Sequence, residues 1–311
     1  MVKLLPTTTD DIESLEPFAQ IRVVAADLDG TLLPAPLKEK VQQFVRSLRH
    51  YRVQFMLATG RTVCGVGGLA AVLELPSGTP LVLYNGSVVV EHKTGRLLRR
   101  ATLPPGSLAA ILQRAAQWPC EVFAYFYHLP LEAGTKSDLL VEQVLGWSFG
   151  QRVESRVERE FNNCLVDWRE VADELPTANP CAVLLKARTP EMMEAAAGDI
   201  AKLPGISMTR SGSIYLELRP DGSDKSVGLS CAIQNLGFSR AEVLAIGDND
   251  NDAEMLAWAG IGVAIAESSP AALIRADYVC QRRTFEGVLE VLQVVRAARR
   301  LFPEVRKRVA A

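Results

Sequence analysis

Residues 21–33, IRVVAADLDGTLL, are the stretch that decides the fold. The almost continuous apolar run at 21–26 predicts a strand that is buried on both faces. Asp27 and Asp29 follow this strand directly and precede the flexible Gly30. Two close carboxylates resist joint ionisation unless a cation lies near them, so the pair predicts a site for a hard divalent ion with oxygen ligands. The alternative is an ordinary acidic turn at the end of a strand.

Four further apolar runs resemble the first and end as abruptly in small or polar residues. They predict buried strands at residues 53–58, 81–84, 243–246 and 262–265. Stretches compatible with helices, such as residues 37–48 and 252–258, lie between or after them. This alternation predicts an α/β fold with a doubly wound, mostly parallel sheet.

In such a sheet the ligand binds beyond the carboxyl ends of the strands, so the residues that follow each strand are the candidate site residues. They are Asp27 and Asp29, Thr59, Gly60 and Arg61, Asn85 and Gly86, and Gly247 and Asp248. Independent strand ends therefore deliver carboxylates, a hydroxyl group and an amide to one edge. We expect a polar active site at this edge.

The richest acidic cluster is residues 247–252, GDNDND. A calcium-binding loop that starts at Asp248 would need Gly at its sixth position and Glu at its twelfth, where this chain has Ala253 and Ala259, so that alternative fails. Asp and Asn residues also cap helices well. Capping would explain one residue of the cluster but not all five.

Lys225 precedes a helix-compatible stretch at residues 227–236. A lone lysine is ordinarily a solvated surface charge. Beside Asp27 and a phosphate group, Lys225 would instead neutralise anionic oxygens and keep the carboxylate ionised. Both interpretations stay open from this residue alone.

The pattern changes between residues 87 and 220, where short alternating segments are interleaved with Ala-rich helical stretches. This change predicts an α+β domain inserted through two hinges, one near Asn85 and the other at the turn-prone residues 219–223. We therefore divide the chain into an N-terminal extension at 1–20, a catalytic core at 21–87 and 221–311, and an inserted domain at 88–220.

The composition is that of an ordinary globular protein, with 311 residues, 48% hydrophobic residues and a net charge of -2. This charge balance disfavours nucleic acid as a partner. We find neither a signal peptide nor an apolar run long enough to span a membrane. We expect a cytoplasmic protein, or an organelle protein if Met1 follows a transit peptide, without a membrane partner and as a monomer or weak homodimer. The six scattered cysteines contain no C-x-x-C pair and predict reduced thiols.

Residues 65–70, GVGGLA, imitate a dinucleotide-binding fingerprint after a strand. Such a fingerprint requires an acidic residue about 20 positions further on. The next predicted strand ends in Tyr84 and Asn85 instead. We therefore discount a dinucleotide cofactor.

Taken in order, these motifs resemble the haloacid dehalogenase (HAD) superfamily, in its large-cap branch of Cof-type phosphatases. The matching segments are DLDGTL at 27–32, ATGR at 58–61, Lys225 and GDNDND at 247–252, with Asn85 and Gly86 as the extra element before the cap. The order of the motifs matches along nearly all of the chain after residue 20, whereas the cap matches only in size and placement. One departure is Ser226, where the family often has Gly after the lysine.

The resemblance implies a role for each matched residue. Asp27 would be the nucleophile that attacks phosphorus, and Asp29 the general acid and then the base. Asp27, the backbone carbonyl of Asp29 and Asp248 would bind Mg²⁺, and Asp252 would support the metal's water shell or orient Lys225. The implied residues on the substrate and phosphate side are Thr59, Gly60, Arg61, Asn85, Lys225 and Asn251.

The implied function is Mg²⁺-dependent hydrolysis of a phosphomonoester, through an aspartyl-phosphate intermediate, on a small phosphorylated metabolite such as a sugar phosphate. A phosphomutase or phosphotransferase would share Asp27 and Asp29, and a sugar-phosphate-binding regulator would keep the fold without catalysis. Substrate specificity would reside in the inserted domain. Its candidates are Tyr125, Tyr127, His128 and residues 210–213, although the tyrosines could simply face one side of a strand and 210–213 could be a hairpin turn.

Overall fold

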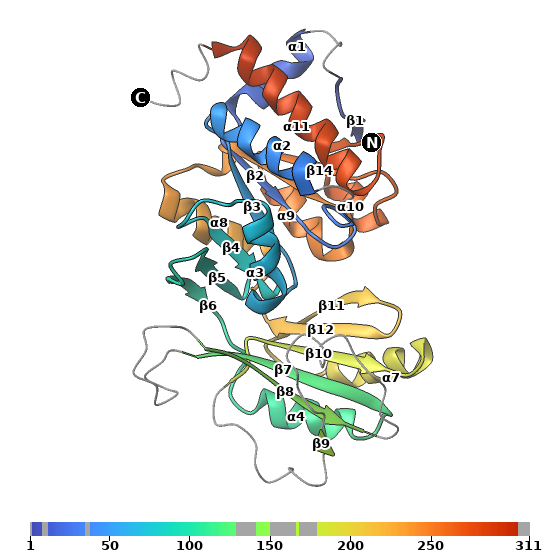
Figure 1. The fold of residues 1–311 in the computed structure, drawn as a ribbon. Helices are drawn as coiled ribbons and strands as arrows, with labels where there is room; N and C mark the ends of the chain where they lie inside the picture. The colour runs from blue at the N-terminus through green and yellow to red at the C-terminus, as the bar shows by residue number, and fades with distance from the viewer. Residues whose placement is uncertain are drawn as a thin grey trace. The chain divides into compact units, whose positions relative to one another are not determined.

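The computed structural model describes residues 2–7, 12–34, 38–128, 141–149, 166–167 and 179–303 (Figure 1). The chain divides into two compact units. The first consists of Met1–Gly60, Gly67–Leu98 and Asp224–Ala311. The second consists of Arg61–Val66 and Arg99–Ser223. Each unit has its own sheet and its own hydrophobic core.

A mixed sheet forms the centre of the first unit and has nine strands in the described part of the chain. Neighbouring strands are parallel from one edge as far as the seventh, and the eighth is antiparallel to the seventh. In spatial order the strands are β1 (Lys3–Leu4), β15 (Tyr278–Val279), β14 (Ile261–Ala264), β13 (Val243–Gly247), β2 (Val23–Ala26), β3 (Gln54–Ala58), β4 (Pro80–Leu83), β5 (Val88–Glu91) and β6 (Leu97–Arg100).

Helices accompany this sheet in two packed groups. The last helix packs against α2 and η1, whereas α8 packs against α9 and α9 against α10 (Figure 1). The helices are α1 (Ile12–Leu15), η1 (Glu16–Gln20), α2 (Lys38–His50), α3 (Val63–Val72), η2 (Tyr84–Gly86), α8 (Lys225–Leu236), η3 (Arg240–Glu242), η4 (Asp250–Asp252), α9 (Ala253–Trp258), α10 (Pro270–Arg275) and α11 (Thr284–Leu301). The architecture confirms the predicted doubly wound, mostly parallel α/β fold.

The central strands are apolar because they are buried on both faces. Each of the five predicted strands is present, with bounds that differ by one or two residues. Ala26 at the end of β2 pairs with Leu57 of β3 and with Ile246 of β13. This register brings the carboxyl ends of the three strands side by side, so the polar residues that follow them emerge at one edge.

The second unit contains a sheet of six strands in the described part of the chain, all antiparallel except the last pair. Its helices α4 (Ser107–Ala115) and α7 (Pro190–Ile200) pack against each other, and their apolar residues join the core of the unit. In spatial order the strands are β11 (Ile206–Gly212), β12 (Tyr215–Pro220), β10 (Ala182–Ala187), β7 (Cys120–His128), β8 (Val141–Ser148) and β9 (Val166–Asp167).

Both ends of the first unit's sheet reach beyond the core bounds drawn from the sequence. β5 and β6 continue the sheet as an antiparallel edge, so the first unit extends to Leu98 instead of ending at residue 87. Their alternation had indicated the inserted domain, because an antiparallel edge strand and an α+β domain share this pattern. At the other end, β1 pairs with β15 and Phe18 is fully buried, so residues from 1–20 also belong to the first unit.

The five cysteines of the described part are free thiols, and Cys164 lies outside it. Among the helices that the structure describes, none has the length and apolar character that a membrane span requires. Residues 65–70 lie within the helix α3 instead of in a phosphate-binding loop.

Candidate active site

Asp27 occupies the position directly after β2 at the centre of the sheet. Its backbone N–H donates to the carbonyl of Ile246 at 2.9 Å, which extends the pairing of β2 with β13 by one residue. The residue is 4% exposed, and one carboxylate oxygen lies 2.6 Å from the Lys225 Nζ. The carboxylate is thus held in a buried, polar environment and not in a solvated turn.

Lys225 is the first residue of α8, and the local sequence explains its position. The Asp224 side chain caps the helix by accepting from the N–H groups of Ser226 at 2.7 Å and Val227 at 3.2 Å. A Cβ on Gly86 would overlap the Asp224 carbonyl, and Gly86 has a φ of 90°. Only glycine therefore lets the end of β4 approach the start of α8 this closely. Lys225 is fully buried and is not the solvated surface charge that the sequence left open.

Asp252 joins the acidic segment after β13 to this lysine. One carboxylate oxygen accepts from Lys225 Nζ at 2.6 Å, and the other accepts from the backbone N–H groups of Asp248 at 3.0 Å and Asn249 at 3.1 Å. The Asn249 side chain in turn caps η4 by accepting from the Asp250 N–H. Helix capping therefore explains the presence of Asn249 and one of the two roles of Asp252. It does not explain the Asp248 carboxylate, which takes no part in the capping.

Three carboxylates converge beside Lys225. Asp27, Asp248 and Asp252 each offer one oxygen, and these oxygens lie within 4.8 Å of one another. Three carboxylates face a single ammonium group, which leaves negative charge that a divalent cation would neutralise. The donors are all hard oxygen atoms, which suit Mg²⁺. The residues present therefore fit the metal site that the sequence predicted, with Asp27 and Asp248 as the two carboxylates nearest to that role.

The pKa values reflect this imbalance of charge. Burial raises the pKa of Asp27 to about 8, although Lys225 acts in the opposite direction. Burial also raises the pKa of Asp248 to about 6, and its hydrogen bond from Thr31 partly opposes the shift. Burial acts to lower the pKa of Lys225, but Asp252 and Asp27 outweigh it and raise that pKa above its ordinary value. A bound cation would favour the ionised form of both carboxyl groups.

The predicted phosphate-binding side chains come from neighbouring strand ends. Asn251 Nδ2 donates to Asn85 Oδ1 at 3.1 Å, and the Asn85 N–H donates to the Thr59 carbonyl at 3.0 Å. Asn85 has a φ of 50°, in the left-handed region that asparagine tolerates better than most residues. Thr59 is buried and Gly60 is half-buried. The structure thus links Thr59, Asn85 and Asn251 in one chain of contacts.

Other predicted site residues are not part of this group. Asp29 is exposed and its carboxylate does not join the three carboxylates, although its charge raises the pKa of Asp248. Arg61 belongs to the second unit, where its guanidinium donates to the Gly65 carbonyl at 3.4 Å. Tyr125 and Tyr127 are buried on the same face of β7.

The remaining candidates in the inserted domain include His128 and Ser211. The side chains of these two residues are not among those that the structure describes. Residues 210–213 lie at the turn of the β11–β12 hairpin, which agrees with the hairpin alternative.

Two residues that carry the geometry were missed by the sequence reasoning. Thr31 is fully buried and its Oγ1 donates to Asp248 Oδ1 at 2.5 Å. Gly30 has a φ of 91°, and a Cβ there would overlap the Asp248 carboxylate. Both belong to the quoted stretch at 21–33, but no local signal relates them to a residue more than 200 positions away. The capping role of Asp224 was detectable from its place before a helix.

A doubly wound sheet with carboxylates that converge beyond its strand ends, beside a lysine from helix α8, is typical of the active site of an α/β enzyme. A family model described as haloacid dehalogenase-like hydrolase matches residues 24–292. The chain therefore belongs to this family of hydrolases, which confirms the resemblance to the HAD superfamily and its Cof-type branch.

Individual relatives cover nearly the whole chain. The phosphoglycolate phosphatase of Natronomonas pharaonis is 25% identical over 88% of this chain and 97% of its own length. The 5-amino-6-(5-phospho-D-ribitylamino)uracil phosphatase YcsE of Bacillus subtilis is 22% identical over 88% of this chain and 95% of its own. A haloacid dehalogenase-like hydrolase from Bacteroides thetaiotaomicron has a similar fold, with a TM-score of 0.68 at 22% identity over 88% of this chain and 98% of that one.

Proposed function

We propose that this protein is a Mg²⁺-dependent phosphomonoester hydrolase that forms its phosphoryl intermediate on Asp27. Its class, a HAD-type phosphatase, follows from the family match and from relatives that are themselves phosphatases. The observation that supports the mechanism best is the buried group of Asp27, Lys225, Asp248 and Asp252. A structural ion pair would need one carboxylate for one lysine, whereas this group has three.

In the proposed reaction an Asp27 oxygen attacks phosphorus, and the bond to the leaving oxygen breaks as Asp29 protonates that oxygen. Asp29 then removes a proton from a water molecule, which attacks the same phosphorus and releases inorganic phosphate and the free Asp27 carboxylate. Lys225 neutralises the nucleophile before attack and the phosphoryl oxygens during it. The exposure of Asp29 suits a group that must exchange its proton with the leaving group and with water.

Asp27, the backbone carbonyl of Asp29 and Asp248 would hold Mg²⁺, with Asp252 supporting the site. When bound, the ion would stabilise negative charge on the phosphoryl group. Thr59, Asn85 and Asn251 would donate hydrogen bonds to phosphate oxygens, with Gly60 and Arg61 on the substrate side. The contact between Asn251 and Asn85 supports placing these two amides at one subsite.

We propose that the substrate is a small phosphorylated metabolite, with sugar phosphates as the first class to test. The two relatives named above act, by their names, on phosphate esters of small hydroxylated molecules. The second unit, which comprises Arg61–Val66 and Arg99–Ser223, would select the leaving group, with Tyr125 and Tyr127 as its candidates. We further expect a cytoplasmic protein that is a monomer or weak homodimer.

The experiment measures release of inorganic phosphate from p-nitrophenyl phosphate and from a panel of phosphorylated metabolites, with and without Mg²⁺. We expect Mg²⁺-dependent release and a hydroxylamine-sensitive phosphoenzyme, as an acyl phosphate requires. A phosphomutase or phosphotransferase would transfer the phosphoryl group to a second hydroxyl compound without releasing phosphate. A binding regulator would release none from any substrate, and either result would overturn the proposal.

A further inference from the structure

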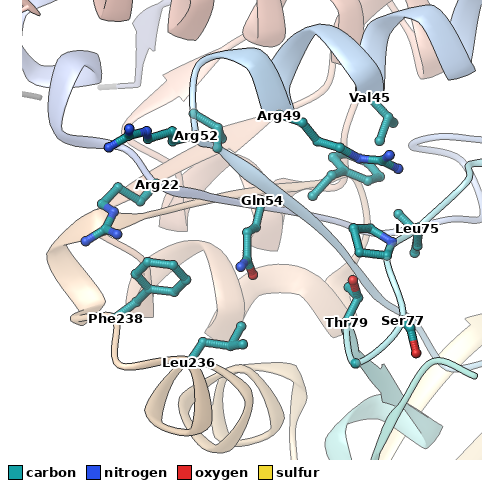
Figure 2. A pocket seen from close by; sticks show the side chains of 14 residues that line it. Arg22, Val45, Arg49, Arg52, Gln54, Leu75, Ser77, Thr79, Leu236 and Phe238 are labelled. Carbon is teal, nitrogen blue, oxygen red and sulfur yellow. The ribbon is translucent and has the colours of Figure 1, made fainter. Parts of the chain in front are cut away.

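A pocket lies near the amino ends of β2 and β3, at the opposite end of these strands from Asp27 (Figure 2). Its volume is about 380 Å³, within the range of small-molecule sites. Arg22 precedes β2 and Asp27 follows it, and five extended residues span roughly 16 Å. The pocket is therefore separate from the cluster of carboxylates.

The lining of this pocket is basic, and the described residues that form it include no aspartate or glutamate. Arg22, Arg49 and Arg52 line it together with uncharged polar residues such as Gln54 and with the apolar Leu236 and Phe238. In Figure 2 the side chains of Arg22 and Arg52 lie on one side, that of Arg49 lies on the other, and Gln54 is between them. Three guanidinium groups with an apolar wall are suited to an anion that carries a carbon skeleton.

The backbone conformation at Arg52 is the second observation. Helix α2 ends in a Schellman motif, in which the N–H of Arg52 donates to the Arg49 carbonyl and that of Val53 donates to the Leu48 carbonyl. Arg52 occupies the left-handed position of this motif with a φ of 58°. Glycine is the usual residue there, because a Cβ is unfavourable in this conformation. Backbone preference therefore does not account for the arginine.

Structural roles explain the other two arginines in part. Arg49 donates to the Glu74 carbonyl near the end of α3, and Arg22 pairs with Glu242 at 3.3 Å and covers the Phe238 ring at 4.5 Å. The guanidinium of Arg52 has no hydrogen-bond or ion-pair partner among the residues that the structure describes.

Two helix C-termini, those of α2 and α3, adjoin the pocket, and each contributes roughly half a negative charge. Together they amount to about one negative charge, which three arginines exceed. Glu242, the ion-pair partner of Arg22, adds one further negative charge, so the pocket keeps an excess of about one positive charge.

We propose that this pocket binds a small organic phosphate. The phosphate group pairs with Arg52 beside Arg22, where a guanidinium can bind two of its oxygens. The carbon skeleton packs on Phe238 and Leu236 and extends past Gln54 toward Arg49. This inference does not depend on the proposed catalytic function.

The test uses α,β-methylene-ADP as the probe, because its terminal phosphorus is bonded through carbon and resists hydrolysis. Binding to the full chain is measured by isothermal titration calorimetry without Mg²⁺, which disfavours binding at the carboxylates. We expect Arg52→Gly to weaken binding by about tenfold or more, the loss typical of one charge-assisted hydrogen bond. Glycine suits the backbone at this position, so the variant should fold with an unchanged or higher Tm.

Arg46→Gln is the matched control, because Arg46 is an exposed arginine of the same helix that does not line the pocket. This variant should bind the probe like the unmodified protein, and both variants should hydrolyse p-nitrophenyl phosphate at the unmodified rate. Equal binding by Arg52→Gly and the unmodified protein would overturn the proposal, as would equal weakening by Arg46→Gln. Absence of binding to the unmodified protein at millimolar probe would also overturn it.

Discussion

The Lys225 ammonium group lies 2.6 Å from an Asp27 carboxylate oxygen, although 198 residues separate them in the chain. Asp27 follows a central strand and Lys225 begins a helix whose N-cap lies against Gly86. The pair is buried and includes Asp252 as the second acceptor of the same ammonium group. The charge on Asp27, the proposed nucleophile, is therefore controlled by a residue that follows the inserted domain in the sequence.

Replacing the nucleophile tests the mechanism most directly. We expect Asp27→Asn to lower kcat for p-nitrophenyl phosphate by about 10⁴-fold or more, because an amide cannot form the acyl phosphate. The fold should persist, since the shape is kept and Lys225 retains Asp252. Asp250→Asn is the control, because Asp250 is an exposed acid of the same cluster outside the carboxylate group. Comparable activity in the two variants would contradict the assignment.

Removing the buried cation should destabilise the protein. Lys225→Met leaves Asp27 and Asp252 without their shared partner, and loss of one member of a buried ion pair costs about 3–5 kcal/mol. We expect the free energy of unfolding in urea to fall by roughly this amount near pH 8, and by less near pH 5, where carboxyl groups can protonate.

Lys40→Met provides the matched control for this measurement, because Lys40 is an exposed lysine of α2 in the same unit. Its effect on the free energy of unfolding should stay within about 0.5 kcal/mol. If the two variants unfold at the same urea concentration, Lys225 does not neutralise the buried carboxylates in solution.

The raised carboxyl pKa values predict how stability depends on pH. Their ordinary value is 3.8, whereas the folded values are about 8 for Asp27 and about 6 for Asp248. Between roughly pH 4 and pH 8 the folded protein thus holds protons that the unfolded chain has lost, so the metal-free protein should lose stability as pH rises through this window. Bound Mg²⁺ must displace these protons, so we expect it to raise the Tm more near pH 8 than near pH 5. An equal rise at both pH values would contradict the prediction.

The close approach of Gly30 to Asp248 predicts a specific effect on metal binding. A Cβ in Gly30→Ala would overlap the Asp248 carboxylate and displace it. We expect the Mg²⁺ concentration for half-maximal activity to rise by about tenfold or more. Gly95→Ala is the control, because Gly95 has a φ of 70° with open space around its Cβ position. Gly95→Ala should lower the free energy of unfolding by about 1–2 kcal/mol and leave Mg²⁺ activation unchanged. If the Mg²⁺ concentration for half-maximal activity rises equally in both variants, backbone strain alone explains the effect.

The hydroxyl of Thr31 should tune the Asp248 carboxylate. Thr31→Val keeps the shape but removes the hydrogen bond that holds down the pKa of Asp248. We expect weaker Mg²⁺ activation, with the largest deficit on the acidic side of the pH profile, where Asp248 would be protonated. Thr31→Ser restores the hydroxyl and should recover the activation. Failure of serine to recover it would assign the effect to packing.

Much of the site could be predicted because its residues follow strands that local sequence identifies. Asp27, Thr59, Asn85 and Asp248 each come directly after a buried apolar run, and parallel strands end at one edge. The bounds of the two domains were harder to predict from the sequence, because the alternating pattern of β5 fits both an edge strand and a separate α+β domain. The double role of Asp252, as a cap and as a partner of Lys225, was also hidden, since its contacts come from two segments.

Local sequence patterns are enough to predict the doubly wound core, the order of the motifs and the kinds of atoms that reach the site. These properties depend on local patterns: apolar runs make buried strands, and the polar residues that follow them lie at one edge of the sheet. Only the folded chain shows that Lys225 is the buried partner of Asp27 and not a surface charge. The same holds for the carboxylate oxygens of Asp248 and Asp252 that accept hydrogen bonds from Thr31 and Lys225. These outcomes depend on register and helix packing between distant segments, which a single local pattern does not contain.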